Sequence, residues 1–149
     1  MRLTASPDVT QVAAALRALS RDMDDPYLME DAVLSRALAC GAASAVLAAE
    51  GVTPVGVALY TAFPSTTRGR MGAFVTDLWV DAGQRGTGLG RRMLAMVRDE
   101  MVARWGGSFL RLNYYADNPG AAGFYARLGF QPKPQEIWVT LEGERLGAL

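Results

Sequence analysis

The sequence predicts an α/β (α+β) fold in which helices flank a mixed, mostly antiparallel sheet. Three apolar, β-rich runs follow one another at a spacing typical of an antiparallel meander; they span residues 45–49, 54–63 and 72–80. An amphipathic helical pattern over 88–104 then leads to a fourth run at 109–115. Because a crossover helix joins the last two strands, we expect them to be parallel, which makes the sheet mixed.

The N-terminal part is expected to contain a short edge strand and two helices. Residues 1–4 form the strand, and Ser6 and Pro7 supply the cap and first residue of a helix. Asp25-Pro26 repeats this start signal, and the second helical pattern continues to about Cys40-Gly41.

The C-terminal part is expected to contain one short helix and one strand. Asp117-Asn118-Pro119 begins the helix, and Gly129 ends it. A final strand is predicted over 136–141. The 149 residues show no internal repeat, linker or low-complexity tail, so we expect a single domain over 1–149.

The composition excludes several kinds of chemistry. The chain has no histidine, which excludes Ser-His-Asp and Cys-His catalysis, and its single cysteine excludes an internal disulfide and a cysteine-rich metal site. We therefore expect no metal. The 15 basic residues balance the 15 acidic ones, which argues against broad nucleic-acid binding. No apolar run could cross a membrane and no signal region precedes the fold, so a cytoplasmic location is expected.

A glycine-rich loop connects the strand at 72–80 to the helix that follows. Strand, glycine loop and helix N-terminus together form a phosphate site, because free N–H groups and the positive end of the helix dipole meet there. A dinucleotide fingerprint starting at Gly86 would need glycine at the position of Arg91. An ATPase-type loop would need Gly-Lys-Ser/Thr, and the only lysine is Lys133.

Two motifs resemble the GCN5-related N-acetyltransferase (GNAT) superfamily. The first is the glycine loop, Arg85-x-x-Gly88-x-Gly90. The second comprises Asp117-Asn118, a stretch of small residues, Phe124-Tyr125 and Leu128-Gly129-Phe130. The resemblance covers residues 43–141. It implies a GNAT fold whose sheet splays open between the 72–80 and 109–115 strands, with acetyl-CoA as cosubstrate.

The same resemblance implies how acetyl-CoA is held. The pantetheine arm would pair with the backbone of the open strand, as an added strand does, and the loop N–H groups would receive the pyrophosphate. The expected cofactor-binding residues are Leu78, Trp79, Val80, Arg85, Gly86, Thr87, Gly88, Leu89, Gly90, Arg91 and Asn118.

Two residues are candidates for catalysis. Tyr125 matches the family's general acid, which protonates the leaving thiolate; the alternative is that it only packs its helix. Asp77 is a candidate base, or orders a water that acts as one; the alternative is a hydrogen bond to a neighbouring loop. A backbone N–H of Leu78 or Trp79 could stabilise the oxyanion.

Further segments resemble the diamine and thialysine acetyltransferase branch, among them Phe63-Pro64-Ser65-Thr66 and the region around Trp138. Where that branch has Glu-Asp, this chain has Thr76-Asp77. We expect the acceptor amine to meet Asp24, Tyr27 and Asp77, although the acidic stretch around Asp24 could also be a solvated loop.

The expected function is transfer of an acetyl group from acetyl-CoA to a primary amine of a small molecule, such as a diamine or an amino acid. Acetylation of protein or peptide N-termini or lysines remains open, as does a non-catalytic acyl-CoA-binding sensor. Family members often pair through their C-terminal strands, so a homodimer is expected, without nucleic-acid or membrane partners.

Overall fold

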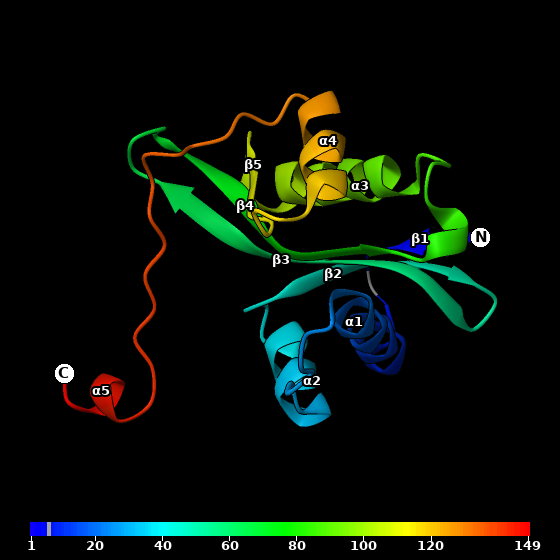
Figure 1. Cartoon of the computed structure of the whole chain (residues 1–149), viewed down its shortest axis with the longest axis horizontal. Coiled ribbons are helices and arrows are strands. Elements are labelled where there is room, and N and C mark those ends of the chain that lie inside the picture. Colours follow the sequence, from blue (N-terminus) through cyan, green and yellow to red (C-terminus); the bar gives the residue numbers. More distant parts are fainter. Residues whose placement is uncertain (6) are drawn as a thin grey trace. The chain divides into compact units, whose positions relative to one another are not determined.

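The computed structural model describes residues 1–5 and 7–149. The contacts within the chain divide it into two units, Met1–Asn113 and Tyr114–Leu149. Figure 1 labels the helices and strands of both. The proposed helix cap Ser6 lies outside the described residues.

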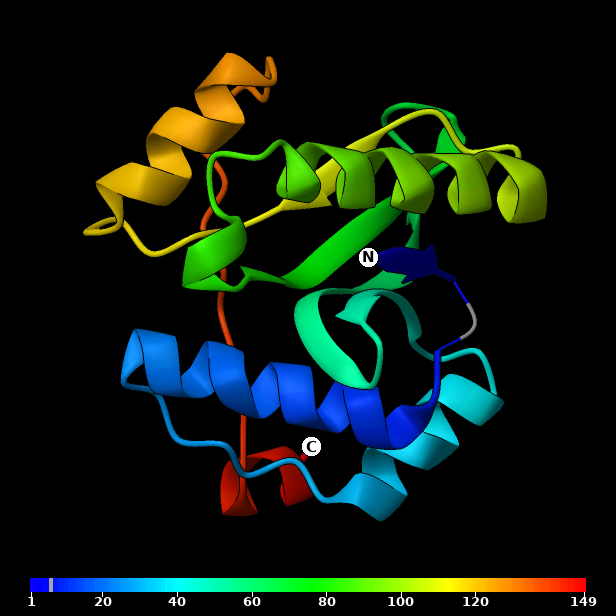
Figure 2. The same cartoon turned by 90° about the vertical axis from the view of Figure 1, so that its right-hand side faces the viewer.

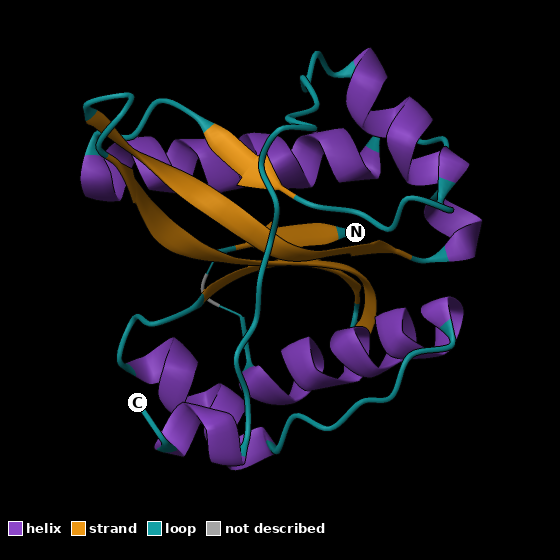
Figure 3. Cartoon of the chain, turned by 60° about the vertical axis from the view of Figure 1, so that its left-hand side comes forward, coloured by secondary structure: helices purple, strands orange, loops and turns teal. Residues whose placement is uncertain are grey.

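The first unit is built on one five-stranded sheet, which is orange in Figure 3. The strands lie side by side in the order in which they occur in the chain. The strands are β1 (Arg2–Thr4), β2 (Ser44–Glu50), β3 (Thr53–Ser65), β4 (Arg70–Val80) and β5 (Leu110–Leu112). Neighbouring strands are antiparallel except β4 and β5, which are parallel. The predicted meander, edge strand and crossover are therefore confirmed, with β5 shorter than expected.

Helices cover both faces of this sheet. The helices α1 (Val9–Met23) and α2 (Asp31–Ala39) lie on one face, and α3 (Leu89–Trp105) lies on the other (Figure 2). The core under α1 joins Val12 and Leu16 to Val57 and Trp79 of the sheet. On the α3 side the packing is close: a Cβ on Gly56 would lie 2.8 Å from the sulfur of Met93. These contacts fix the ends of β4 and α3, between which the glycine loop runs.

A β-bulge at Thr76 explains why the sheet opens. Tyr60 pairs with Val75 and Leu59 pairs with Asp77, so Thr76 is the additional residue on β4. Its hydroxyl donates to the Leu59 carbonyl at 3.2 Å. A bulge bends its strand and increases the local twist. In the described chain β5 pairs with β4 only from Ala73 to Val75, and β4 continues to Val80 without a neighbour on that side. The predicted splay between the two strands is confirmed.

The ends of the first two helices differ from the prediction. Helix α1 begins at Val9, and Asp8 is its cap, accepting from the N–H groups of Thr10 and Gln11. Pro7 therefore precedes the helix. The predicted second start at Asp25-Pro26 is wrong, because Asp25 closes α1 instead: its N–H donates to the Ser20 carbonyl at 2.9 Å.

The second unit contains helix α4 (Pro119–Arg127) and a short helix, α5 (Glu144–Gly147). Asn118 caps α4 by accepting from the Ala121 N–H at 3.0 Å, which confirms the predicted start of this helix. Gly129 follows the end of the helix with φ +88°, as predicted. The predicted strand over 136–141 is wrong. Ile137 and Val139 are 84% and 88% exposed, and the described part of this unit has no strand to pair with them.

Candidate active site

The glycine loop follows β4 directly and ends at the first turn of α3. A short 3₁₀ turn, Ala82–Gln84, leads to Gly86 and Gly88, whose φ angles are +79° and +83°. Residues with a side chain rarely adopt these φ angles, so the backbone conformation requires glycine at both positions. A Cβ at either position would meet no atom within 4 Å. The space beside both glycines is therefore open to a ligand.

The backbone N–H groups from Gly86 to Arg91 are the groups of this loop that can bind a ligand. Among the described residues none of them donates a hydrogen bond, and the first helical bond runs from the Arg92 N–H to the Gly88 carbonyl. Helix α3 has 17 residues, so the positive end of a long dipole lies at these groups. Arg91 and Arg92 are exposed beside them. This arrangement is suited to a phosphate or pyrophosphate.

The open edge of β4 lies next to the loop. Leu78 to Val80 pair with β3 on one side, while β5 pairing has already ended at Val75. Their backbone groups on the other side have no strand partner in the described chain. An extended ligand can form main-chain hydrogen bonds along such an edge.

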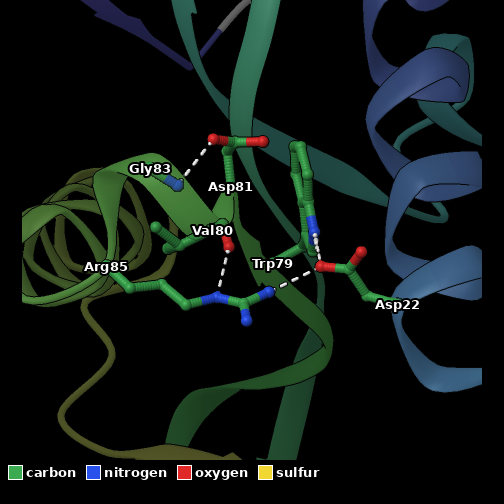
Figure 4. Close-up of polar contacts among 6 residues, drawn as sticks. All are labelled: Asp22, Trp79, Val80, Asp81, Gly83 and Arg85. Atoms are coloured by element: carbon green, nitrogen blue, oxygen red, sulfur yellow. Dashed lines mark hydrogen bonds and ion pairs between the residues drawn. The ribbon is translucent and has the colours of Figure 1, made fainter.

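One carboxylate, that of Asp22 at the end of α1, joins β4 to the glycine loop (Figure 4). Its Oδ2 accepts from Nε1 of Trp79 at 3.0 Å and from the Arg85 guanidinium at 2.5 Å. Nε of Arg85 also donates to the Val80 carbonyl at 3.0 Å. The Arg85 side chain is therefore turned toward Asp22 and Val80. Asp81 binds its own loop, accepting from the Gly83 N–H at 2.9 Å.

Asp77 and Tyr27 lie within electrostatic reach of each other. Burial raises the pKa of the Asp77 carboxyl, and the neighbouring Thr76 hydroxyl opposes this shift. Burial also raises the pKa of Tyr27; the nearby Arg17 lowers it, and the Asp31 and Asp77 charges raise it further. The Arg17 guanidinium lies 4.9 Å from the centre of the Tyr27 ring. The Tyr27 hydroxyl is buried without a hydrogen-bond partner in the described structure.

The third predicted acceptor residue, Asp24, has a different local role. It is exposed and ends α1 in the left-handed conformation, with φ +55°. Of the three predicted acceptor residues, the structure brings Tyr27 and Asp77 close together. Asp24 instead ends helix α1.

Tyr125 lies in an aromatic cluster of the second unit. Its ring centre is 5.6 Å from Tyr114, 5.1 Å from Phe124 and 5.5 Å from Phe130. The residue is 8% exposed, and burial raises the pKa of its hydroxyl to about 12. The phenol therefore keeps its proton throughout the neutral pH range.

Sequence comparison decides the family. The model described as "Acetyltransferase (GNAT) family" matches residues 12–130. This chain belongs to the GNAT family. No relative among curated proteins is found by sequence comparison.

Solved structures agree with the GNAT fold. A Trypanosoma brucei acetyltransferase is 21% identical with a TM-score of 0.71, covering 94% of this chain and 99% of its own. A ribosomal-protein-alanine N-acetyltransferase from Brucella melitensis biovar Abortus 2308 is 17% identical with a TM-score of 0.74, covering 95% and 100%. An aminoglycoside acetyltransferase from an uncultured soil metagenomic sample is 14% identical with a TM-score of 0.79, covering 95% of each chain.

Membership of the GNAT family makes this chain an acetyltransferase, and GNAT acetyltransferases use acetyl-CoA. The free N–H groups and the open space beside Gly86 and Gly88 fit a pyrophosphate. In the described part of the chain, no group of potential metal ligands gathers and no helix is long and apolar enough to span a bilayer.

The contacts of Asp22 in this GNAT protein could not be predicted from the sequence. This residue is one of three acids within four positions, Asp22, Asp24 and Asp25, and only the tertiary structure separates it from the others. Helical periodicity offered no signal, because Asp22 acts on a strand 57 residues away.

Proposed function

We propose that this protein is an N-acetyltransferase that transfers the acetyl group of acetyl-CoA directly to a primary amine of a small molecule. The observation that carries the proposal is the run of unpartnered N–H groups from Gly86 to Arg91, at the start of a 17-residue helix. A charged ligand with a pyrophosphate satisfies these groups, and the neighbouring open edge of β4 suits the extended arm of acetyl-CoA.

The proposed cofactor site combines backbone and side-chain groups. Leu78, Trp79 and Val80 form the open end of β4, where the main-chain groups of Leu78 and Val80 face away from β3. Arg85 directly precedes the free N–H groups of the loop. Asn118 already accepts one helical N–H through its Oδ1, which leaves its side-chain amide N–H groups as donors. The loop contribution comes from Gly86, Thr87, Gly88, Leu89, Gly90 and Arg91.

The proposed acceptor site is formed by Asp77 and Tyr27, with Asp24 at its rim. A carboxylate and a buried hydroxyl without a partner attract an ammonium group and can hydrogen-bond it. The amine must lose a proton before it attacks. Because burial raises the pKa of Asp77, its carboxylate is a better proton acceptor than an ordinary aspartate, directly or through a water.

Thr76 bears on the acceptor class within the family. The diamine and thialysine branch, which this chain resembles, has glutamate at this position, whereas the Thr76 hydroxyl binds the Leu59 carbonyl. Of positions 76 and 77, only Asp77 therefore carries a carboxylate in this chain. We propose a small primary amine as the acceptor.

Tyr125 is the proposed general acid for the leaving thiolate. Its hydroxyl is protonated at neutral pH because burial raises its pKa to about 12. It donates this proton to the sulfur as the carbon–sulfur bond breaks, and the proton that leaves the amine goes to Asp77 or to solvent. We also propose a homodimer and a cytoplasmic location.

Release of free thiol tests the proposal. The protein is mixed with acetyl-CoA and with separate panels of diamines, amino acids, N-terminal peptides and lysine peptides. We expect amine-dependent thiol release with the small amines. Release only with peptides would replace the proposed acceptor, and binding of acetyl-CoA without any release would identify a sensor.

A further inference from the structure

We propose that Asp22 is a positioning residue that aligns the open end of β4 with the glycine loop, so that both can hold one acetyl-CoA. This inference rests on the proposed function. Asp22 touches neither the free N–H groups nor the open edge; it acts through Trp79 and Arg85.

The contact with Trp79 fixes the strand. Trp79 is 6% exposed, and Asp22 accepts its only side-chain donor at 3.0 Å. A buried donor without a partner is unfavourable, so the indole holds to this carboxylate. Trp79 lies between Leu78 and Val80 on the part of β4 that has no strand beyond it. The indole contact with Asp22 therefore holds this end of the strand against α1.

The contacts of Arg85 fix the loop. Its guanidinium binds Asp22 Oδ2, and its Nε binds the carbonyl of Val80, five residues earlier. Together with the bond from the Arg85 N–H to the Ala82 carbonyl, these contacts close the chain from 80 to 85 into a compact turn. The free N–H groups begin with the next residue, Gly86. The direction of these groups is therefore set by how Arg85 is held.

Because the ion pair between Asp22 and Arg85 is exposed, we assign it a role in positioning the site rather than in stabilising the fold. The side chains of Arg85 and Asp22 are 56% and 41% exposed, and such surface pairs contribute little to folding. What distinguishes this pair is that one oxygen, Asp22 Oδ2, serves two elements of the site at once. Its loss should let the strand and the loop move independently, which weakens a ligand that must touch both.

The test measures the affinity of the full chain for CoA by calorimetry, well below the melting temperature. The variants are Asp22→Asn, Arg85→Gln and the double variant. Asparagine retains an acceptor for Trp79 but removes the ion pair. We expect each single change to lower the affinity for CoA by about tenfold, which is within the range found for coupled residues of one network. Because both changes break the same link, we expect the double variant to bind about as weakly as the weaker single variant.

The control is Asp99→Asn. It removes another carboxylate that forms an exposed ion pair, with Arg98 on α3, at 2.7 Å. We expect its CoA affinity to equal that of the wild type. Asp22→Glu retains the charge and should recover part of the affinity.

Two further measurements separate positioning from simple loss of structure. The indole N–H resonance of Trp79 should shift in Asp22→Asn and not in Asp99→Asn. In turnover, the KM for acetyl-CoA should rise more than kcat falls. A purely structural residue would lower the melting temperature and leave the affinity of the folded protein unchanged.

The outcomes distinguish this inference from the proposed function. A wild-type protein that binds CoA, with Asp22→Asn and Arg85→Gln within about twofold of it, below the effects typical of networks, overturns the positioning role alone. If Asp22→Asn fails to fold, Arg85→Gln decides. A wild-type protein that does not bind CoA overturns both.

Discussion

Replacement of Tyr125 by phenylalanine separates its chemistry from its packing. The substitution removes one hydroxyl and keeps the ring that lies 5.1–5.6 Å from Tyr114, Phe124 and Phe130. The aromatic contacts should survive, so we expect the free energy of unfolding at pH 7 to change by less than about 1 kcal/mol, the usual net value of one hydrogen bond. Loss of a general acid should lower kcat by about 10²- to 10⁴-fold.

The pH dependence provides a second, independent magnitude. Burial raises the pKa of Tyr125 from 10.0 to about 12, and this difference corresponds to about 3 kcal/mol in favour of the neutral phenol. Below pH 10 the phenol is protonated in both the folded and the unfolded chain, so this stabilisation is complete. Between pH 10 and about 12 only the unfolded chain releases the proton, and stability falls. The phenylalanine variant should lack this loss.

The assay compares wild type and Tyr125→Phe in turnover of acetyl-CoA with an accepted amine, in CoA calorimetry and in denaturant unfolding from pH 7 to 11. The affinity for CoA should stay within about threefold, since the proposed contacts lie on other residues. Ionisation of Tyr125 should not reduce wild-type kcat below pH 10, because its raised pKa keeps it protonated. A variant that retains more than about a third of wild-type kcat would refute the general-acid assignment, as this is far above the expected range.

Three other predictions follow from the described contacts. Gly88→Asp should abolish the rise in melting temperature that acetyl-CoA gives the wild type, whereas Gly69→Asp, at a similar φ of +63° and equally unobstructed, should keep it; equal shifts would move the phosphate site elsewhere. Asp77→Asn should raise the melting temperature at pH 7 and lower kcat, because a folded-state pKa above the unfolded value means that the ionised carboxylate destabilises the fold; a lower melting temperature would contradict this. Light scattering should give the mass of a homodimer at micromolar concentration, and a monomer mass would remove that proposal.

The glycine loop was largely predictable because its signals are local. Gly86 and Gly88 have the positive φ that glycine permits, and α3 begins at Leu89, close to the predicted start. The helix ends at Trp105, next to the predicted end at 104, and Gly106 follows it with φ +59°. The two motifs of the GNAT family are also runs of nearby residues, so the family could be inferred as well.

Boundaries that depend on competition between neighbours were less predictable. Asp25-Pro26 has the composition of a helix start, but Asp25 is used to close α1, and α2 begins only at Asp31. The segment 136–141 has the apolar residues of a strand, yet a strand forms only where another edge receives it.

The sequence by itself determined the order of the strands, the crossover helix, the glycine loop and the acetyltransferase family, because periodicity, turn chemistry and short motifs are properties of contiguous residues. Only the tertiary structure showed that Thr76 forms the bulge at which the sheet opens, that Tyr27 and Asp77 come close, and that Asp22 joins Trp79 to Arg85. These features arise from contacts between residues far apart in the chain. No local pattern specifies them, because each depends on how the helices and the sheet pack.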